Sequence, residues 1–298
     1  MQRGSDAAQP VASRLGGRGI TSAAVVGYFS LRATTTGFGT VKLPGGRPDR
    51  WSASEVTDLG LAELRAPAPP QYLWLHYFDA HVPYPAIPAD LAVPAIAYPS
   101  LAYLARLAFI DREIGRLLDV LDLTSPGRTA FLVTADHGEG LGEHGVEYHG
   151  VTTYESIVHV PAFLVAPGVA PGTHDGVASH RDVAATILGA FGAVAGSDAE
   201  LFGRSWLRLR AEPGAALHRF VVTRSAGATT LYHGFASPTV AIVEGRYKFA
   251  KSFGNGFRVM FDVNADPGEE HNVEPEHPEE ARAMERELEL YRDLDAYP

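Results

Sequence analysis

Two short apolar runs separated by a helical pattern constrain the fold of this chain more than any other feature of its sequence. Residues 72–78 and 130–134 are mostly apolar or aromatic and are bounded by turn-forming residues, which is typical of strands buried on both faces. Between them, residues 103–121 carry apolar side chains at intervals of three and four, as does a helix that covers a sheet. Strand, helix and strand in this order predict a right-handed βαβ unit in a mostly parallel sheet.

The same alternation of strands and helices extends along most of the chain. We expect further strands at residues 22–27 and 162–166 and further helices at residues 53–65 and 181–191, with loop structure up to Arg18. These elements predict one α/β domain that ends near residue 207.

The C-terminal part of the chain has a different pattern. Extended runs at residues 239–251 and 257–262 predict an antiparallel hairpin, and a charged helix with an apolar stripe follows at residues 279–292. The segment Asp266-Pro267-Gly268-Glu269 is predicted to be only a turn. The sequence therefore predicts an α/β domain and a smaller α+β subdomain, at residues 1–207 and 208–298.

Composition excludes several classes of protein. The net charge is −10 and no cluster of Lys and Arg is present, so nucleic acid is not an expected partner. No apolar run reaches the roughly 18 residues of a membrane span. Residues 1–19 lack the apolar core of a signal peptide, so we expect a cytoplasmic protein. Cysteine is absent, which excludes disulfides, thiolate metal ligands and a cysteine nucleophile.

Polar side chains follow both buried strands at their carboxyl ends, where ligands bind in open α/β sheets. The first strand leads to Asp79 and His81, and the second leads to a glycine-rich segment that carries Asp136, His137, Glu139, His144 and His149. An adjacent carboxylate and imidazole can bind a cation, with Gly138 leaving room for its approach. A single such pair is more simply a capping Asp and a surface His. Two strand ends and four histidines are hard to explain by packing, and they favour a site.

Several fragments, in the same order along the chain, are similar to segments of a known family. Residues 72–84 are similar to the pattern W-x-H-x-F-D-P-H-x-P-Y, with Ala80 in place of the usual proline, and residues 131–145 are similar to F-T-S-D-H-G-E-x-L-G-E-H-G. Later fragments also match, at residues 148–155, 160–161, 166–168, 182–188, 203–207, 245–249 and 261–269. Together they resemble the sulfatases of the alkaline phosphatase superfamily.

The resemblance implies a fold, a site and a reaction. The fold would be an alkaline-phosphatase-like α/β fold, with a mostly parallel sheet flanked by helices and a small C-terminal antiparallel sheet plus helix. The reaction would be metal-dependent hydrolysis of a small anionic sulfate ester. Asp136 and His137 would form half of a divalent metal site, for calcium first, with manganese or zinc as alternatives. His81 and His149 would hold the sulfate oxygens or protonate the leaving alkoxide. Three further side chains would orient these ligands or simply cap loops: Asp79, Glu139 and His144.

The nucleophile of the family is not found in this sequence. Sulfatases carry metal-binding aspartates at the end of their first strand and then a C/S/T-x-P-S/A-R motif, and neither is recognisable here. Formylglycine cannot form from cysteine in this chain, because it has none. Residues 19–26 resemble a family segment that comes after the nucleophile, so we expect a sheet that is incomplete at the N-terminus. Such a sheet would have an exposed edge that favours self-association.

One segment matches the spacing of the nucleophile motif but not its place. Residues 124–128 read T-S-P-G-R and link the predicted helix to the second buried strand. They would therefore lie at the amino edge of the sheet, and we expect a turn. The chain by itself is expected to be inactive or nearly so. Two alternatives stay open: a phosphodiester or phosphonate monoester hydrolase of the same superfamily, and a non-catalytic remnant that binds anions or a partner.

Overall fold

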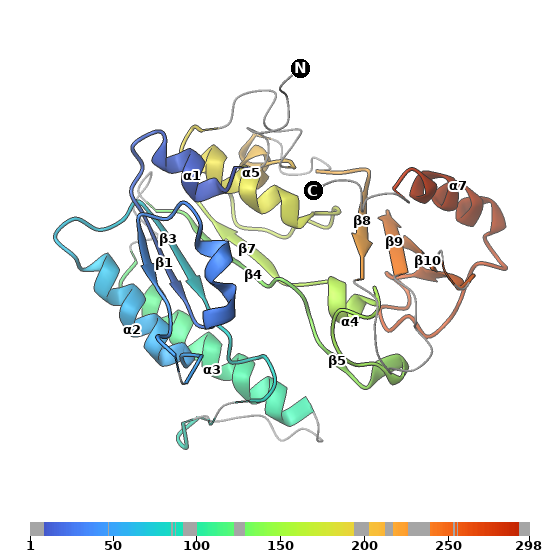
Figure 1. The fold of residues 1–298 in the computed structure, drawn as a ribbon. Coiled ribbons are helices and arrows are strands. Elements are labelled where there is room, and N and C mark those ends of the chain that lie inside the picture. Colours follow the sequence, from blue (N-terminus) through green and yellow to red (C-terminus); the bar gives the residue numbers. More distant parts are fainter. Residues whose placement is uncertain are drawn as a thin grey trace. The chain divides into compact units, whose positions relative to one another are not determined.

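The chain folds as two compact units, shown in a computed structural model in Figure 1. Unit 1 comprises residues 1–130, 166–168 and 184–207, and unit 2 comprises residues 131–165, 169–183 and 208–298. The structure describes residues 9–46, 48–84, 86, 88–91, 100–121, 129–193, 203–211, 217–225, 239–252, 254 and 256–291. The predicted turn at residues 124–128 lies outside them.

The sheet of unit 1 is parallel, as predicted. Its order is β2 (Thr40–Lys42), β1 (Ser22–Val26) and β3 (Tyr72–His76), with Val26 opposite His76. Strand β1 is the central strand of this sheet, and all five of its residues are buried. The chain returns to β3 through helix α2 (Ala53–Leu64), which makes β1, α2 and β3 a parallel βαβ unit.

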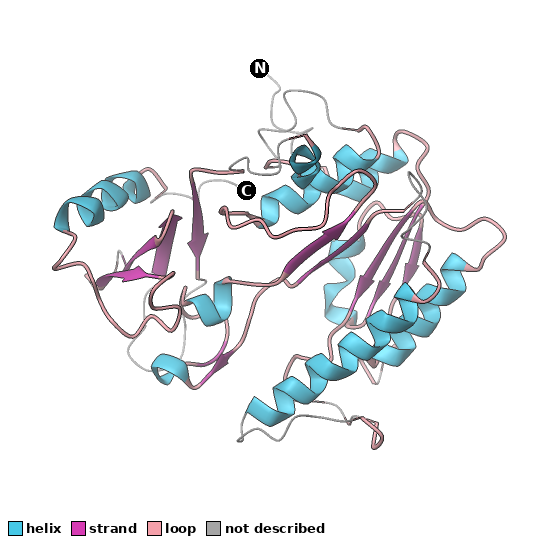
Figure 2. Ribbon diagram, turned by 180° about the vertical axis from the view of Figure 1, so that it is seen from behind, coloured by secondary structure: helices cyan, strands magenta, loops and turns pink. Residues whose placement is uncertain are grey.

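Two long helices accompany this sheet. Helix α2 (Ala53–Leu64) contacts β1 and β3, and helix α3 (Ser100–Leu118) packs on α2; Figure 2 shows the two helices running side by side across the sheet. Ser52 begins α2 with a capping box, in which its side chain accepts from Glu55 N and the Glu55 carboxylate accepts from Ser52 N. This pair satisfies backbone donors that the first turn of a helix leaves open.

The predicted loop before Arg18 is wrong, because helix α1 (Val11–Gly16) lies there. No side chain caps it, so its own sequence gives little signal. Leu15 is fully buried and packs with Leu188 of α5 (His180–Ala190), a helix that spans residues of both units. Tertiary packing, which a local pattern does not reveal, therefore stabilises this short helix.

The pairing of the two strands that carry the candidate residues also differs from the prediction. Strand β4 (Phe131–Thr134) pairs antiparallel with β7 (Ala162–Val165), and β3 has β1 as its neighbour among the described strands. An apolar run indicates a buried strand but does not specify its partner. Two short strands follow β4, namely β5 (Gly140–Leu141) and β6 (Glu147–Tyr148), and they form a small hairpin around η2 (Glu143–Gly145).

The C-terminal part of unit 2 is an antiparallel sheet with a helix, as predicted. Its order is β11 (Arg258–Asp262), β10 (Tyr247–Ser252), β9 (Thr239–Glu244) and β8 (Phe220–Arg224). The run predicted at residues 239–251 is two strands, because a turn with Gly245 at φ +60° separates β9 from β10. Helix α7 (Pro278–Glu289) buries Ala281, Met284 and Leu288 against the sheet.

The remaining short elements connect these parts. They are η1 (Phe29–Thr35), α4 (Glu155–Val158) and η3 (Trp206–Arg210). Among the described residues, no helix combines the length and the apolar character needed to cross a membrane. The observed α/β architecture with a small antiparallel C-terminal sheet agrees with the predicted fold class. The predicted division at residue 207 stays a prediction.

Candidate active site

The seven predicted site residues are divided between the two units. Asp79 and His81 follow β3 in unit 1. The other five lie in unit 2, on the segment between β4 and α4: Asp136, His137, Glu139, His144 and His149.

A pair of stacked histidines is the centre of the unit 2 segment. The rings of His137 and His149 lie 3.9 Å apart between centroids, with 24° between their planes. His149 Nδ1 lies 3.0 Å from Oε1 of Glu139, whose side chain is buried. The hydrogen bond to Glu139 raises the pKa of His149, although burial opposes the shift. His149 therefore keeps its proton to a higher pH than an ordinary histidine.

His137 and Asp136 present the atoms that a cation would need. His137 Nδ1 lies 2.8 Å from the carbonyl oxygen of Gly138, and because a carbonyl only accepts, Nδ1 carries the hydrogen. This leaves the lone pair of Nε2 available, 3.7 Å from Asp136 Oδ2. The donor set of one carboxylate and one imidazole fits half of a divalent metal site. Within the described part of the chain, no group of three or more His, Cys, Asp or Glu side chains could hold a metal.

Glycine at position 138 is required by a close backbone contact. A Cβ atom there would lie 2.1 Å from the carbonyl oxygen of Ser156, and Gly138 N donates to Ile157 O at 2.7 Å. Helix α4 therefore lies directly against the backbone next to His137. From the sequence we expected Gly138 to leave space for a cation, but a backbone atom of α4, the carbonyl oxygen of Ser156, lies on the side where its Cβ would be.

His144 contacts a different part of unit 2. Its Nε2 lies 2.8 Å from the carbonyl oxygen of Gly268, and its ring stacks on Tyr154 at 3.9 Å and 10°. Its backbone is left-handed, with φ at +54°, which is strained for a residue other than glycine. These contacts link the loop between β5 and β6 to the turn at residues 266–269.

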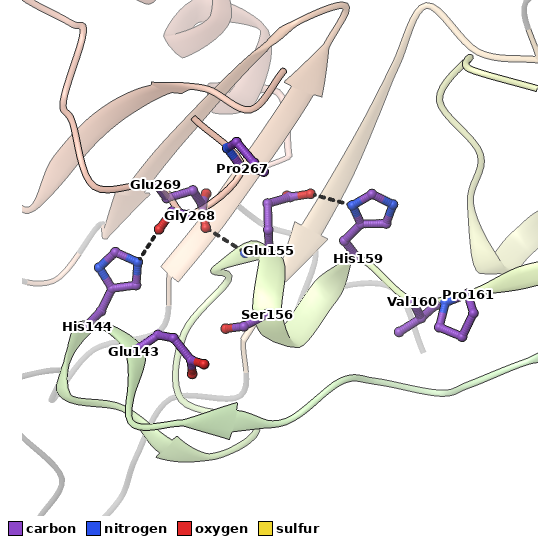
Figure 3. Close-up of a pocket in the computed structure, with 10 residues that line it drawn as sticks. All are labelled: Glu143, His144, Glu155, Ser156, His159, Val160, Pro161, Pro267, Gly268 and Glu269. Carbon is purple, nitrogen blue, oxygen red and sulfur yellow. Dashed lines mark hydrogen bonds and ion pairs between the residues drawn. The ribbon is translucent and has the colours of Figure 1, made fainter. Parts of the chain in front are cut away.

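A pocket of about 480 Å³ lies beside this link, shown in Figure 3. Its three carboxylates and two imidazoles come from three segments of the chain. The full lining is Glu143, His144, Glu155, Ser156, His159, Val160, Pro161, Pro267, Gly268 and Glu269.

An ionic cluster borders this pocket. Lys248 Nζ lies 2.8 Å from Glu155 Oε1 and 2.9 Å from Glu269 Oε1, and its side chain is only 1% exposed. Burial alone would raise the pKa of Glu155, but the hydrogen bond from His159 and the charge of Lys248 lower it to about 2. Residue-by-residue reasoning on the sequence missed this cluster, although a lysine inside the apolar strand β10 was a signal for it.

Asp79 of unit 1 is a buried helix-capping side chain. It is 1% exposed, and its Oδ1 accepts from Ala53 N at the start of α2, at 3.0 Å. Burial raises its pKa. Arg106 is also buried, and its pKa is lowered by burial while the charge of Asp79 opposes the change. Among the described residues, Oδ2 of Asp79 has no hydrogen-bond partner.

His81 lies at one end of a stack of rings in unit 1. Its ring lies 4.5 Å from that of Phe78, which stacks in turn on Tyr28 at 4.2 Å. The guanidinium of Arg50 lies 5.2 Å from the centre of the Phe78 ring, and Arg50 Nη1 donates to Pro83 O at 3.0 Å. The stacking on Phe78 and the contact of His81 Nδ1 with the Val82 carbonyl oxygen, at 2.5 Å, both orient the His81 ring.

The model of the family described as Sulfatase matches residues 21–193, which is more than half of the chain. The chain belongs to the sulfatase family. The order of the motif fragments and the family match therefore agree, and the predicted membership of the alkaline phosphatase superfamily is confirmed.

Known sulfatases and their structural neighbours resemble this sulfatase chain over different lengths. A choline-sulfatase of Rhizobium meliloti (strain 1021) is 33% identical over 178 residues, which cover 58% of this chain and 32% of that protein. The matched regions span about a third of the length of the curated relatives.

Solved structures share the fold of this sulfatase chain over nearly all of its length. The structure of BT4656 in complex with its substrate D-glucosamine-2-N,6-O-disulfate has a TM-score of 0.73 at 16% identity, and it covers 97% of this chain and 83% of that one. The phosphonate monoester hydrolase SpPMH from Silicibacter pomeroyi has a TM-score of 0.70 at 17% identity, over 96% of this chain and 80% of that one. At these identities the two structures show the common fold, which confirms the predicted fold class.

Proposed function

We propose that this sulfatase-family chain carries part of the active site of a metal-dependent hydrolase of small, anionic sulfate esters. The observation that carries the proposal is the stacked pair of His137 and His149, with the carboxylates of Asp136 and Glu139 beside it. A cation-binding pair next to an imidazole with a raised pKa suits an ester whose charge lies on its nonbridging oxygens.

Asp136 and His137 would hold the divalent cation in this proposal. Calcium is the first expectation, with manganese and zinc as alternatives. A bound cation would neutralise charge on the ester oxygens. Two protein ligands are few for calcium, which prefers about six to eight oxygens, so we expect weak binding in which water supplies most of the ligands.

His149 would hold and deliver a proton. Glu139 keeps the imidazolium form stable to a higher pH, and an imidazolium can donate to a sulfate oxygen or protonate the alkoxide that leaves as the S–O bond breaks. For His81, a similar contact with the anion is proposed from the resemblance of residues 72–84 alone. The printed sequence contains no recognisable nucleophile motif, so the attacking oxygen is assigned to no residue of it.

Sulfate is preferred to phosphonate as the group that is hydrolysed. The family match and the choline-sulfatase relative both support a sulfate ester. The phosphonate monoester hydrolase resembles this chain at the level of the fold alone. Its similarity keeps a phosphonate monoester or phosphodiester as the second candidate, because these esters also carry charged nonbridging oxygens.

The metal half of the proposal is tested by NMR with manganese as a paramagnetic probe. Mn²⁺ should broaden the ring signals of His137 in the wild-type chain, and added Ca²⁺ should restore them by competition. Asp136→Asn should need about ten times more Mn²⁺ for the same broadening, because a neutral amide is a poorer ligand for a hard cation. Asp175→Asn, which changes an exposed carboxylate of the same unit, is the matched control. Equal broadening in the two variants would refute the metal assignment.

The anion half is tested by titration with an aryl sulfate and an aryl phosphonate monoester in the presence of Ca²⁺. The ring signals of His149 should shift with the sulfate at lower ligand concentration than with the phosphonate. A tighter response to the phosphonate would favour the second candidate. Binding of neither ester would contradict the proposed anion site.

A further inference from the structure

The turn at residues 266–269 contacts helix α4 and the loop between β5 and β6, two segments that lead to the stacked histidines. Glu269 Oε2 accepts a hydrogen bond from Glu155 N, the first residue of α4, at 2.6 Å. The carbonyl oxygen of Gly268 accepts from His144 Nε2 at 2.8 Å. Figure 3 shows these two contacts on neighbouring residues of one turn. The sequence alone indicated no more than a turn here.

The first contact extends through α4 to His137. The carbonyl oxygen of Ile157 in α4 accepts from Gly138 N at 2.7 Å, directly after His137 in the chain. The approach is so close that no Cβ atom fits at position 138. A displacement of α4 would therefore move the backbone that positions the His137 ring.

The second contact extends through the β5–β6 hairpin to His149. His144 lies in the loop of this hairpin, and β6 ends at Tyr148, one residue before His149. The hairpin pairs Gly140 with Tyr148, which brings Glu139 beside His149. The turn at residues 266–269 therefore contacts the loop of the β5–β6 hairpin through His144.

Glu269 forms a buried ion pair with Lys248. The side chain of Glu269 is 2% exposed and that of Lys248 is 1% exposed, with 2.9 Å between Oε1 and Nζ. Removing one partner of so deeply buried an ion pair would leave the other without a counterion. Glu269 also has a left-handed backbone, with φ at +56°, so its conformation depends on these contacts.

We propose that Glu269, with Lys248 as its counterion, is a positioning residue for the stacked pair of His137 and His149. It acts through Glu155 N and α4 on one side and through the adjacent Gly268 carbonyl and His144 on the other. The proposal rests on the proposed function only because it takes the stacked histidines to be part of the active site.

Two substitutions distinguish the effect of the length of the Glu269 side chain from the effect of its charge. Glu269→Asp keeps the charge but is one methylene shorter, so it should lose the hydrogen bond from Glu155 N. Glu269→Gln keeps the length and an acceptor oxygen but loses the charge. Glu285→Asp is the matched control, since Glu285 also binds Lys251 and Arg258 but contacts neither histidine segment in the described structure.

Two readouts report on the histidine pair without metal or ester. Amide hydrogen exchange at Gly138 should be about tenfold faster in Glu269→Asp, as expected when a hydrogen bond is weakened by about 1.4 kcal/mol. The ring-proton shifts of His137 and His149, which depend on their stacking, should move toward those of unstacked rings. Glu269→Gln should show less than half of either effect, and Glu285→Asp should show neither.

The proposal is overturned if Glu269→Asp leaves both readouts as in the wild type, or if Glu269→Gln disturbs them equally. His144→Phe provides an independent arm, because it keeps a ring against Tyr154 but removes the donor to Gly268. It should alter the His149 ring shifts, and unchanged shifts would also count against the proposal. Failure of manganese binding would contradict the proposed function and leave these readouts unaffected.

Discussion

Replacing Lys248 by methionine should destabilise the C-terminal sheet far more than the same change at Lys251. Methionine has a similar length but no charge, so Glu269 would keep a buried carboxylate whose ammonium partner is gone. Breaking a buried ion pair by removing one partner costs about 3–5 kcal/mol. Lys251 pairs with Glu285 and Glu289 at partly exposed positions, where an ion pair contributes about 0–1 kcal/mol.

Amide hydrogen exchange in β10 and β11 measures the free energy of opening of this sheet in each variant. The wild type should also lose stability between pH 4.5 and about 2, because the folded pKa of Glu155 is depressed to about 2 from its ordinary 4.5. Such a group contributes stability above its unfolded pKa and loses it as the pH falls through the folded pKa. Lys248→Met should lose less over this range. Destabilisation of the two variants within about 1 kcal/mol of each other would refute the argument.

Three further predictions test the packing, the site and the activity. Gly138→Ala should cost about 1–3 kcal/mol in thermal unfolding, because its Cβ would overlap Ser156 O. Gly115→Ala in α3 has open space and should be neutral or stabilising. Leu288→Ala should cost about 2–5 kcal/mol in urea unfolding, whereas Leu290→Ala, at a position 77% exposed, should change stability by less than about 0.5 kcal/mol. We expect the purified chain to hydrolyse aryl sulfates and phosphate diesters no faster than His137→Ala, because no nucleophile motif is recognisable in the sequence and covalent catalysis without a nucleophile is usually several orders of magnitude slower. Multiple turnover that chelation abolishes would contradict this last expectation, and Thr124 would be the first residue to replace.

Elements with a strong local signal were predicted closely from the sequence. The three- and four-residue spacing of apolar side chains at residues 103–121 corresponds to α3, and the Ser52 and Glu55 capping box marks the start of α2. Helix α1 was missed because its stability depends on Leu15 meeting Leu188, far away in the sequence. The pairing of β4 with β7 was missed for a similar reason, since periodicity describes the faces of a strand but not its neighbours.

The candidate site was predictable where its parts are close in sequence. Glu139 and His149 are ten residues apart, and the hairpin between them is short enough for their contact to follow from the loop. Lys248 and Glu155 are separated by 93 residues, and their pairing depends on which strand and which helix are brought together. A charged residue in an apolar strand indicates that a partner is needed, but it does not identify that partner.

Gly138 has a different structural role from the one that its place in the family-like fragment suggested. In the sequence it stands between a candidate metal ligand and Glu139, which suggested that it leaves room for a cation. In the structure the room is taken by the backbone of α4, whose Ile157 carbonyl binds Gly138 N. Glu155, the first residue of α4, donates its N–H to Glu269. The contact between Gly138 and α4 therefore connects the histidine pair to the turn at residues 266–269. The motif and the turn, which are similar to separate family fragments, are therefore connected through α4 by two hydrogen bonds.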